Sequence, residues 1–121
     1  MIHHKKFNEW NDEMRHKLRA ATLGPIAGCM YSHCDHNPDT FVLLDEKNDV
    51  MGWALVTTKY FSYPFTGMFF THHQHRRKGI GTRIAEEVKK CYPSIYVDSW
   101  DGAATRFFAK TGMAHKGLVA V

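Results

Sequence analysis

The sequence predicts a mixed α/β (α+β) fold, with a mostly antiparallel central sheet flanked by helices. Three stretches rich in β-branched and aromatic residues lie within residues 40–71 and are joined by short connections, as in antiparallel sheets. Two other stretches, 8–22 and 80–91, carry apolar residues at the spacing of amphipathic helices. The chain has 121 residues, of which 44% are hydrophobic, and this suits a single domain over residues 1–121.

The first predicted helix extends from about Asn8 to Thr22. Charged side chains separate its apolar positions, which recur every three or four residues: Phe7, Trp10, Met14, Leu18 and Ala21. Asn8 is the expected N-cap, and Gly24-Pro25 is expected to end the helix.

The predicted strands of the central part form an antiparallel meander. The first covers residues 40–44, a turn follows at 45–49, and a longer strand covers 50–58. The third strand covers about 66–71 and is rich in aromatic residues. Residues 25–39, before the meander, are expected to be irregular.

The pattern changes to helical spacing after the meander. A helix over 80–91 is expected to end before Pro93, and a short strand is expected over 94–98. A last helix lies between Asp101, near its N-cap, and Gly112 at its C-terminal end. Residues 113–121 are expected to form a final strand.

The composition limits the classes of protein and partner. The formal net charge is +4 and the pI is about 9.0, so an anionic partner fits: nucleic acid, a phosphorylated cofactor or an acidic protein surface. No stretch has the roughly 18 apolar residues of a membrane helix, and the N-terminus does not resemble a signal peptide. A cytoplasmic location is expected, which for a phage protein would be the host cytoplasm.

Histidines are numerous, yet their spacing and that of the three cysteines do not favour a metal site. The cluster 33–36, with Cys29 nearby, lacks the second ligand pair that zinc sites usually have, so a polar loop is expected instead. The odd number of cysteines and the absence of a secretion signal favour reduced thiols. Cys91, on the second predicted helix, is expected to be packed in the core.

A basic loop with two glycines joins the third strand to the helix over 80–91. Its sequence over 72–82 is HHQHRRKGIGT. The start of a helix offers unpaired N–H groups and a partial positive charge, and the glycines allow an anion to come close. Arg76, Arg77 and Lys78 add full charges at the same point, so a pyrophosphate site is expected. The alternative for the glycines alone is a solvated basic turn.

Two motifs in this half of the chain resemble those of the GNAT superfamily of N-acetyltransferases. Arg76, Gly79 and Gly81 fall on the Q/R-x-x-G-x-G/A pattern of its motif A, which holds the pyrophosphate of acetyl coenzyme A. The stretch A-x-x-F-F-x-x-x-G-M over residues 104–113 is similar to its motif B. For the same residues, helix packing and capping are the alternative interpretation.

The resemblance implies acetyl-CoA as the cofactor. The family binds it where two parallel strands splay apart, here about Phe69–Thr71 and 94–98, and the backbone of the first strand polarises the thioester. The implied cofactor-binding residues are Phe69, Phe70, Thr71, Arg76, Arg77, Lys78, Gly79, Ile80, Gly81, Thr82, Asp101, Ala104, Phe107 and Phe108. The family transfers the acetyl group directly, through a tetrahedral intermediate, so no nucleophilic cysteine is required.

The proton-transfer groups depart from the family pattern. The usual motif-B tyrosine, often the general acid, is Phe108 here. Tyr96 is the leading substitute, and water is the alternative donor. The alternative interpretation of Tyr96 is a core or cross-strand aromatic residue, which is favoured somewhat over a catalytic one. His72 and His73 are candidate bases, and Asp98 could order a water.

The expected function is therefore transfer of an acetyl group from acetyl-CoA to a primary amine. Because the elements that build the acceptor groove in the family are short here, a protein lysine or N-terminus is favoured over a small molecule. The family's first strand is expected to be absent or reduced to Ile2–Lys5, and the chain to be a monomer or homodimer. A catalytically weak GNAT-fold interaction module and a basic nucleic-acid-binding protein remain the alternatives; the latter is less favoured, because the charge clusters at one loop.

Overall fold

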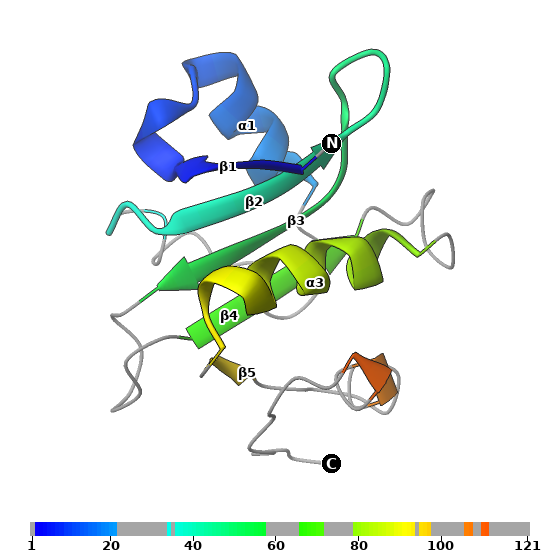
Figure 1. Ribbon diagram of the computed structural model, residues 1–121. Coiled ribbons are helices and arrows are strands. Elements are labelled where there is room, and N and C mark those ends of the chain that lie inside the picture. The colour runs from blue at the N-terminus through cyan, green and yellow to red at the C-terminus, as the bar shows by residue number, and fades with distance from the viewer. Residues whose placement is uncertain are drawn as a thin grey trace.

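A computed structural model gives the architecture of most of the chain. It describes residues 2–21, 34, 36–57, 66–71, 79–93, 95–97, 106–107 and 110–111. One five-stranded sheet has its strands in chain order: β1 (Ile2–Lys6), β2 (Asp39–Leu44), β3 (Val50–Thr57), β4 (Thr66–Thr71) and β5 (Tyr96–Val97). The helices α1 (Asp12–Ala20) and α3 (Ile80–Cys91) pack against it (Figure 1). The predicted mixed α/β fold is confirmed.

The predicted antiparallel meander is confirmed as well. The pairs β1–β2, β2–β3 and β3–β4 are antiparallel, and β5 pairs in parallel with β4. Asp45 organises the turn between β2 and β3, because its Oδ1 accepts the backbone N–H groups of Lys47 and Asp49, each within 2.9 Å. Asn48 adopts a positive φ of 65° in the same turn, a conformation that asparagine tolerates.

The N-terminal helix begins later than the sequence predicts. A short 3-10 turn covers Phe7–Glu9, and Trp10 is extended. The N-cap is Asn11, not Asn8, since the Asn11 side chain accepts the N–H of Met14 at 2.8 Å. The helix breaks at Trp10 because the indole is buried and donates from Nε1 to Thr40 Oγ1 at 2.8 Å. The expected stop at 24–25 lies outside the described residues.

The first strand is present, although the sequence left its existence open. It is β1, which is one residue longer than the reduced strand expected over Ile2–Lys5. It pairs with β2 along its whole length, from Ile2 opposite Leu43 to Lys6 opposite Asp39. It therefore forms one edge of the sheet.

Two apolar clusters occupy the two faces of the sheet, so the described part has three layers. The α1 face holds Phe7, Trp10, Leu18, Ala21, Cys34, Val42, Val50, Trp53, Leu55 and Phe70. The α3 face holds Phe41, Leu43, Ala54, Val56, Ile80, Ile84, Ala85, Val88 and Ile95. The alternation along β2 explains the division, because Phe41 and Leu43 face α3 while Val42 faces α1.

The C-terminal part is described only in places. The predicted helix over 80–91 has the expected bounds, and the strand expected over 94–98 is the shorter β5. Arg106 and Phe107 are helical, and Thr111 donates its N–H to Phe107 O at 3.0 Å, as the predicted last helix requires. The final strand expected over 113–121 lies outside the described residues. Within the described part, no helix is long and apolar enough to cross a membrane.

Candidate functional site

The start of α3 lies directly over the end of β4. Gly52 of β3 pairs with Thr71, the last residue of β4. A Cβ on Gly52 would lie 2.9 Å from Ile80 Cγ2 and 3.2 Å from Ile84 Cδ1. Because Gly52 has no side chain, the first turns of α3 rest close to the sheet at this point. The helix N-terminus and the last residues of β4 therefore lie close together.

The first turn of α3 has features of an anion-binding helix start. Gly79 is the N-cap, is exposed and adopts φ +74°, and nothing lies within 4 Å of the position of a Cβ. The first bond of the helix joins Arg83 N–H to Gly79 O at 3.1 Å. The N–H groups of Ile80, Gly81 and Thr82 precede that bond and have no partner within the helix.

The two described α-helices start in opposite ways. The start of α1 is capped by Asn11 and carries Asp12 and Glu13 in its first turn, so its positive dipole end is compensated. The first turn of α3 has no side-chain cap and no acidic residue. Among the described residues, no side chain compensates the positive end of α3, and the anion site that the sequence predicts at Gly79 and Gly81 stays a prediction.

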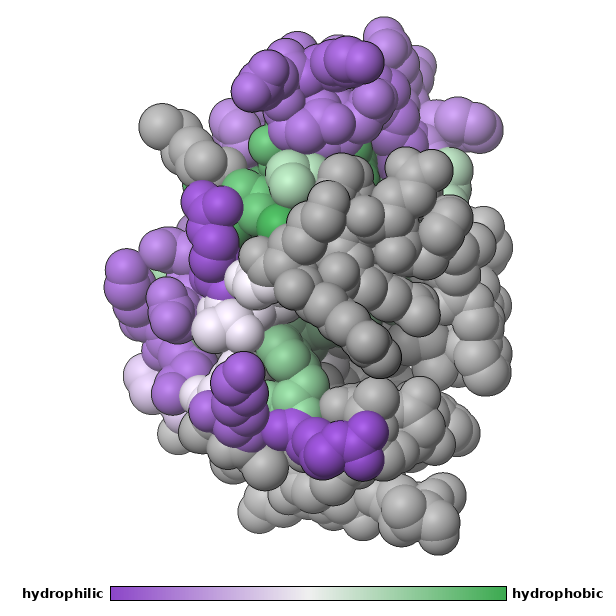
Figure 2. All heavy atoms as spheres, turned by 90° about the vertical axis from the view of Figure 1, so that its right-hand side faces the viewer, coloured by the Kyte–Doolittle hydropathy of each residue, from purple (hydrophilic) through white to green (hydrophobic). Residues whose placement is uncertain are grey.

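Figure 2 views the molecule from the side on which α3 begins in Figure 1. On this face, hydrophilic residues of the described part lie above, to the left of and below a paler and partly apolar area. The described part of the last helix lies on the α3 face of the sheet, because Phe107 packs against the apolar cluster there and contacts Phe69 of β4 edge-to-face, with ring centroids 6.1 Å apart. The sequence proposed both residues for the cofactor site, and the structure brings them together.

The strand β4 directs its two predicted phenylalanines to opposite faces. Phe69 packs on the α3 face, while Phe70 is buried on the α1 face with its ring 5.3 Å from that of Trp53. The side chain of Phe70 therefore lies away from α3, and only its backbone could contribute to a site there. The pairing of β4 with β5 joins Thr66 to Tyr96 and Gly67 to Val97, at the beginning of β4.

Many predicted site residues lie outside the described residues. They are His72, His73, Arg76, Arg77, Lys78, Asp98, Asp101, Ala104 and Phe108. The backbone of Tyr96 is placed opposite Thr66, five residues before the end of β4. Their roles stay predictions.

The prediction that Cys91 is packed in the core is wrong. Cys91 is exposed, whereas Cys34 is buried. Cys91 is the last residue of α3, and the next residue, Tyr92, turns its ring onto Phe41 instead, with centroids 6.2 Å apart. Among the described residues, no group of three or more His, Cys, Asp or Glu side chains could hold a metal ion.

A polar cluster that the sequence did not predict lies at the other end of α3. Asp39, almost completely buried, accepts from Tyr92 Oη at 2.6 Å and contacts His4 Nε2 at 2.6 Å. Burial, and next the hydrogen bond to Asp39, raise the pKa of Tyr92 well above its usual range. The sequence signal was small: an Asp at the start of a buried strand.

The family of the chain follows from a comparison with known proteins. The sequence matches the model of the acetyltransferase (GNAT) family over residues 3–113, so the chain belongs to this family. Membership supports acetyl transfer, and N-acetyl transfer in particular, as the general activity. No curated protein matches the sequence.

Solved structures show the same fold at low sequence identity. A tetramutant of the BH1408 protein from Bacillus halodurans has a TM-score of 0.65 at 13% identity, with 100% of this chain and 97% of that chain covered. An N-acetyltransferase from Staphylococcus aureus Mu50 has a TM-score of 0.57 at 18% identity, covering 97% and 84%. An aminoglycoside 6'-N-acetyltransferase complexed with coenzyme A has a TM-score of 0.58 at 16% identity, covering 78% and 60%.

Proposed function

We propose that this chain uses acetyl-CoA to acetylate a primary amine, on a protein lysine or N-terminus. The observation that carries the proposal is the uncapped start of α3 at Gly79, beside the end of β4. It gives a diphosphate the backbone donors and the positive dipole end that it needs. Family membership and a structural neighbour complexed with coenzyme A support this ligand.

In the proposed complex, the first turn of α3 binds the pyrophosphate. The N–H groups of Ile80, Gly81 and Thr82 donate to phosphate oxygens, and the missing side chains at Gly79 and Gly81 leave room for close approach. Arg76, Arg77 and Lys78 immediately precede this turn in the sequence and supply positive charge.

The acyl end of the ligand lies along β4 in this proposal. The backbone of Phe69, Phe70 and Thr71 lies beyond the two residues of β4 that pair with β5, and it faces the thioester. A backbone N–H there stabilises the charge that develops on the carbonyl oxygen. The contact between Phe69 and Phe107 supports a flanking role for the last helix, to which the proposal also assigns Asp101, Ala104 and Phe108.

The proton transfers are assigned to residues near the splayed strands. His72 or His73 takes the proton from the amine, and Asp98 orders a water. Tyr96 or a water gives a proton to the leaving thiolate, because Phe108 has none to give. An unchanged turnover number for Tyr96→Phe would remove Tyr96 from this role.

Calorimetry with acetyl-CoA tests the ligand. The double variant Arg76→Ala/Gly81→Glu removes one charge and puts an anion into the first turn of α3, so binding should be lost. Lys90→Ala is the matched control, because it removes a positive charge from the exposed last turn of the same helix and should bind normally. Unchanged binding by the double variant would refute the pyrophosphate site.

The acceptor is tested by mass spectrometry after incubation with acetyl-CoA. Lysate proteins and a panel of small amines are compared under the same conditions. New acetyl groups on lysines or N-termini support the protein acceptor, whereas acetylation of small amines alone refutes it. Binding of acetyl-CoA without transfer to any acceptor would identify an interaction module instead.

A further inference from the structure

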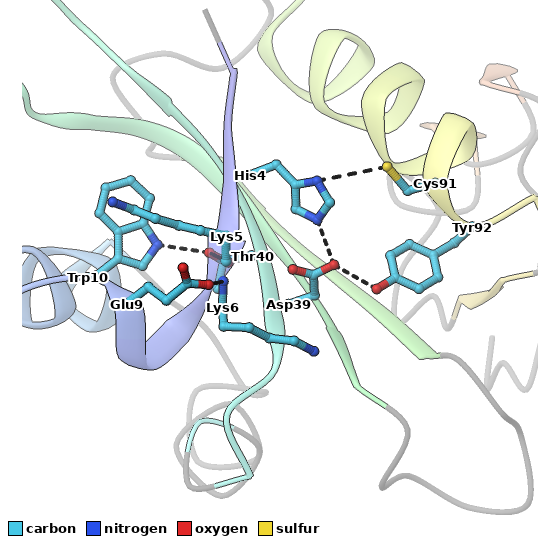
Figure 3. A network of polar contacts seen from close by, with 9 residues as sticks. All are labelled: His4, Lys5, Lys6, Glu9, Trp10, Asp39, Thr40, Cys91 and Tyr92. Atoms are coloured by element: carbon cyan, nitrogen blue, oxygen red, sulfur yellow. Dashed lines mark hydrogen bonds and ion pairs between the residues drawn. The ribbon is translucent and has the colours of Figure 1, made fainter.

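A thiol, an imidazole and a carboxylate meet at the C-terminal end of α3 (Figure 3). Cys91 ends α3, His4 comes from β1, and Asp39 begins β2. The Cys91 Sγ atom lies 3.9 Å from His4 Nδ1, and His4 Nε2 lies 2.6 Å from Asp39 Oδ2. Three separate elements thus bring together a nucleophile, a base and a carboxylate that orients the base, as in catalytic triads.

The hydrogen bonds define which nitrogen of His4 carries the proton. Asp39 Oδ2 accepts from Tyr92 Oη at 2.6 Å, so Tyr92 supplies its own proton to that oxygen. An ionised carboxylate can only accept, and therefore His4 Nε2 must carry the proton that it shares with Asp39. In the neutral ring, Nδ1 is then left with its lone pair, and this nitrogen is the one next to Cys91.

The ring of His4 is also held in place by packing. It stacks on Phe41 with centroids 4.1 Å apart and an angle of 15° between the planes. The His4 side chain is still 40% exposed and Cys91 is exposed, so a small molecule can reach the sulfur. The base is therefore fixed while the nucleophile is accessible.

We propose that Cys91 is a nucleophilic thiol that exchanges with low-molecular-weight disulfides, with His4 as its base and Asp39 as a positioning residue. His4 Nδ1 takes the thiol proton, and the Cys91 sulfur attacks one sulfur of the disulfide. The S–S bond of the reagent breaks as the new mixed disulfide forms. The departing thiolate takes up the proton from His4, so the products are the mixed disulfide at Cys91 and one free thiol.

The helix end makes the reaction depend on His4. The C-terminus of α3 carries partial negative charge, which opposes a negative sulfur at Cys91 and favours a positive imidazole. Lys89 and Lys90 in the same turn are engaged elsewhere, with Thr111 O at 2.9 Å and with Glu87 at 3.1 Å. Once His4 has taken the thiol proton, its imidazolium lies between this helix end and Asp39 and is placed to stabilise the thiolate.

Exchange at sulfur fits this site better than acyl transfer. Acyl transfer would need a donor for the oxyanion, yet the backbone N–H of Tyr92, next to the thiol, is already bonded to Val88 O at 2.8 Å. Disulfide exchange needs only a nucleophile and a leaving group. The site is also separate from the proposed cofactor site, because the 12 residues of α3 span about 18 Å.

The test measures the rate of mixed-disulfide formation with oxidised glutathione, using the full-length chain. Intact-mass spectrometry follows the reaction, and peptide mapping distinguishes Cys91 from Cys29 and Cys34. Adduct formation at Cys91 should dominate in the wild type. His4→Gln should lower the rate constant at Cys91 by roughly tenfold or more, because the base is lost.

His3→Gln is the matched control. His3 is the neighbouring residue in β1, but it packs on Trp10 with centroids 6.0 Å apart, on the other face of the sheet. Its loss should leave the rate unchanged. His4→Phe provides a second variant, which keeps the stacking on Phe41 and removes both ring nitrogens. Equal rates at Cys91 in folded wild type and either His4 variant, or adducts at Cys29 or Cys34 but not at Cys91, would overturn the proposal.

The role of Asp39 has a spectroscopic test. Nitrogen NMR shifts of His4 should show the neutral ring protonated at Nε2 in the wild type, and a loss of this preference in Asp39→Asn. The rate at Cys91 should fall in parallel. A wild-type ring protonated at Nδ1 would contradict the assignment, because Nδ1 could not then accept the thiol proton.

Discussion

Ile80, the first residue of α3, contacts the position where Gly52 of β3 would carry a side chain. A Cβ on Gly52 would come within 2.9 Å of Ile80 Cγ2 and 3.1 Å of Phe70 O. The helix α3 can therefore pack this close to the sheet only because residue 52 is a glycine. The same glycine fixes the position of the α3 N-terminus relative to β4.

Gly52→Ala should damage stability and ligand binding together. The added methyl group meets a side chain and a backbone oxygen, so a destabilisation of about 1–3 kcal/mol is expected in urea unfolding. The displaced helix start should also weaken acetyl-CoA binding in calorimetry. Leu55→Ala is the control, because it opens a cavity on the α1 face and should cost stability without changing affinity. An unchanged affinity in Gly52→Ala would contradict the proposed geometry.

Thr82→Glu should move stability and affinity in opposite directions. An acid in the first turn of α3 compensates the helix dipole and should add about 0.3–1 kcal/mol to the free energy of unfolding. The same charge repels a pyrophosphate, so acetyl-CoA should bind more weakly. Thr82→Gln is the control, because a glutamine side chain has nearly the same shape as glutamate but no charge. It should change neither the stability nor the affinity through electrostatics. If Thr82→Glu and Thr82→Gln bind equally well, the anion does not sit at this turn.

Thr40→Val should destabilise the junction of β1 with α1. Thr40 Oγ1 accepts from Trp10 Nε1 at 2.8 Å and donates to Lys5 O at 2.5 Å, and Thr40 is fully buried. Valine has a similar shape but leaves the indole N–H unsatisfied, so a loss of about 1–3 kcal/mol is expected from thermal or urea unfolding. Thr40→Ser keeps the hydroxyl and should lose less. A smaller loss for valine than for serine would show that methyl packing dominates at this position.

The stabilising contribution of Tyr92 should be lost in alkali. Its pKa is raised in the folded state by burial and by the hydrogen bond to Asp39, so the folded state holds the phenol proton more tightly than the unfolded state. The resulting stability is complete below the unfolded pKa of about 10 and is lost as the pH rises above it. In Tyr92→Phe this component is absent. The difference in unfolding free energy between wild type and Tyr92→Phe should therefore shrink above about pH 10, and a constant difference would contradict the assignment.

Local patterns predicted the elements that bury a regular apolar face. The bounds of α3 and β4 agree with the prediction, because their signals lie within one stretch of chain. The edge strand β1 was harder to predict, since His3, His4, Lys5 and Lys6 give it little apolar character. Its stability comes instead from backbone pairing with β2 and from the Trp10–Thr40–Lys5 hydrogen bonds.

The two proposed sites also differ in how far local sequence patterns could predict them. The start of α3 was predictable because glycine and a helix start are adjacent in sequence, and their geometry follows from local rules. The contact between His4 and Asp39 joins residues 35 positions apart, and that between Tyr92 and Asp39 joins residues 53 apart. No spacing rule connects such residues, so only the tertiary fold reveals them.

The position of β1 at the edge of the sheet has a consequence for the order of folding. The β2–β3–β4 meander closes through short connections, whereas β1 must find β2 across a long segment, at a greater cost in loop-closure entropy. During refolding, β1 should therefore gain protection from hydrogen exchange later than the meander. His4 belongs to β1, so the thiol at Cys91 acquires its base only after β1 has paired with β2.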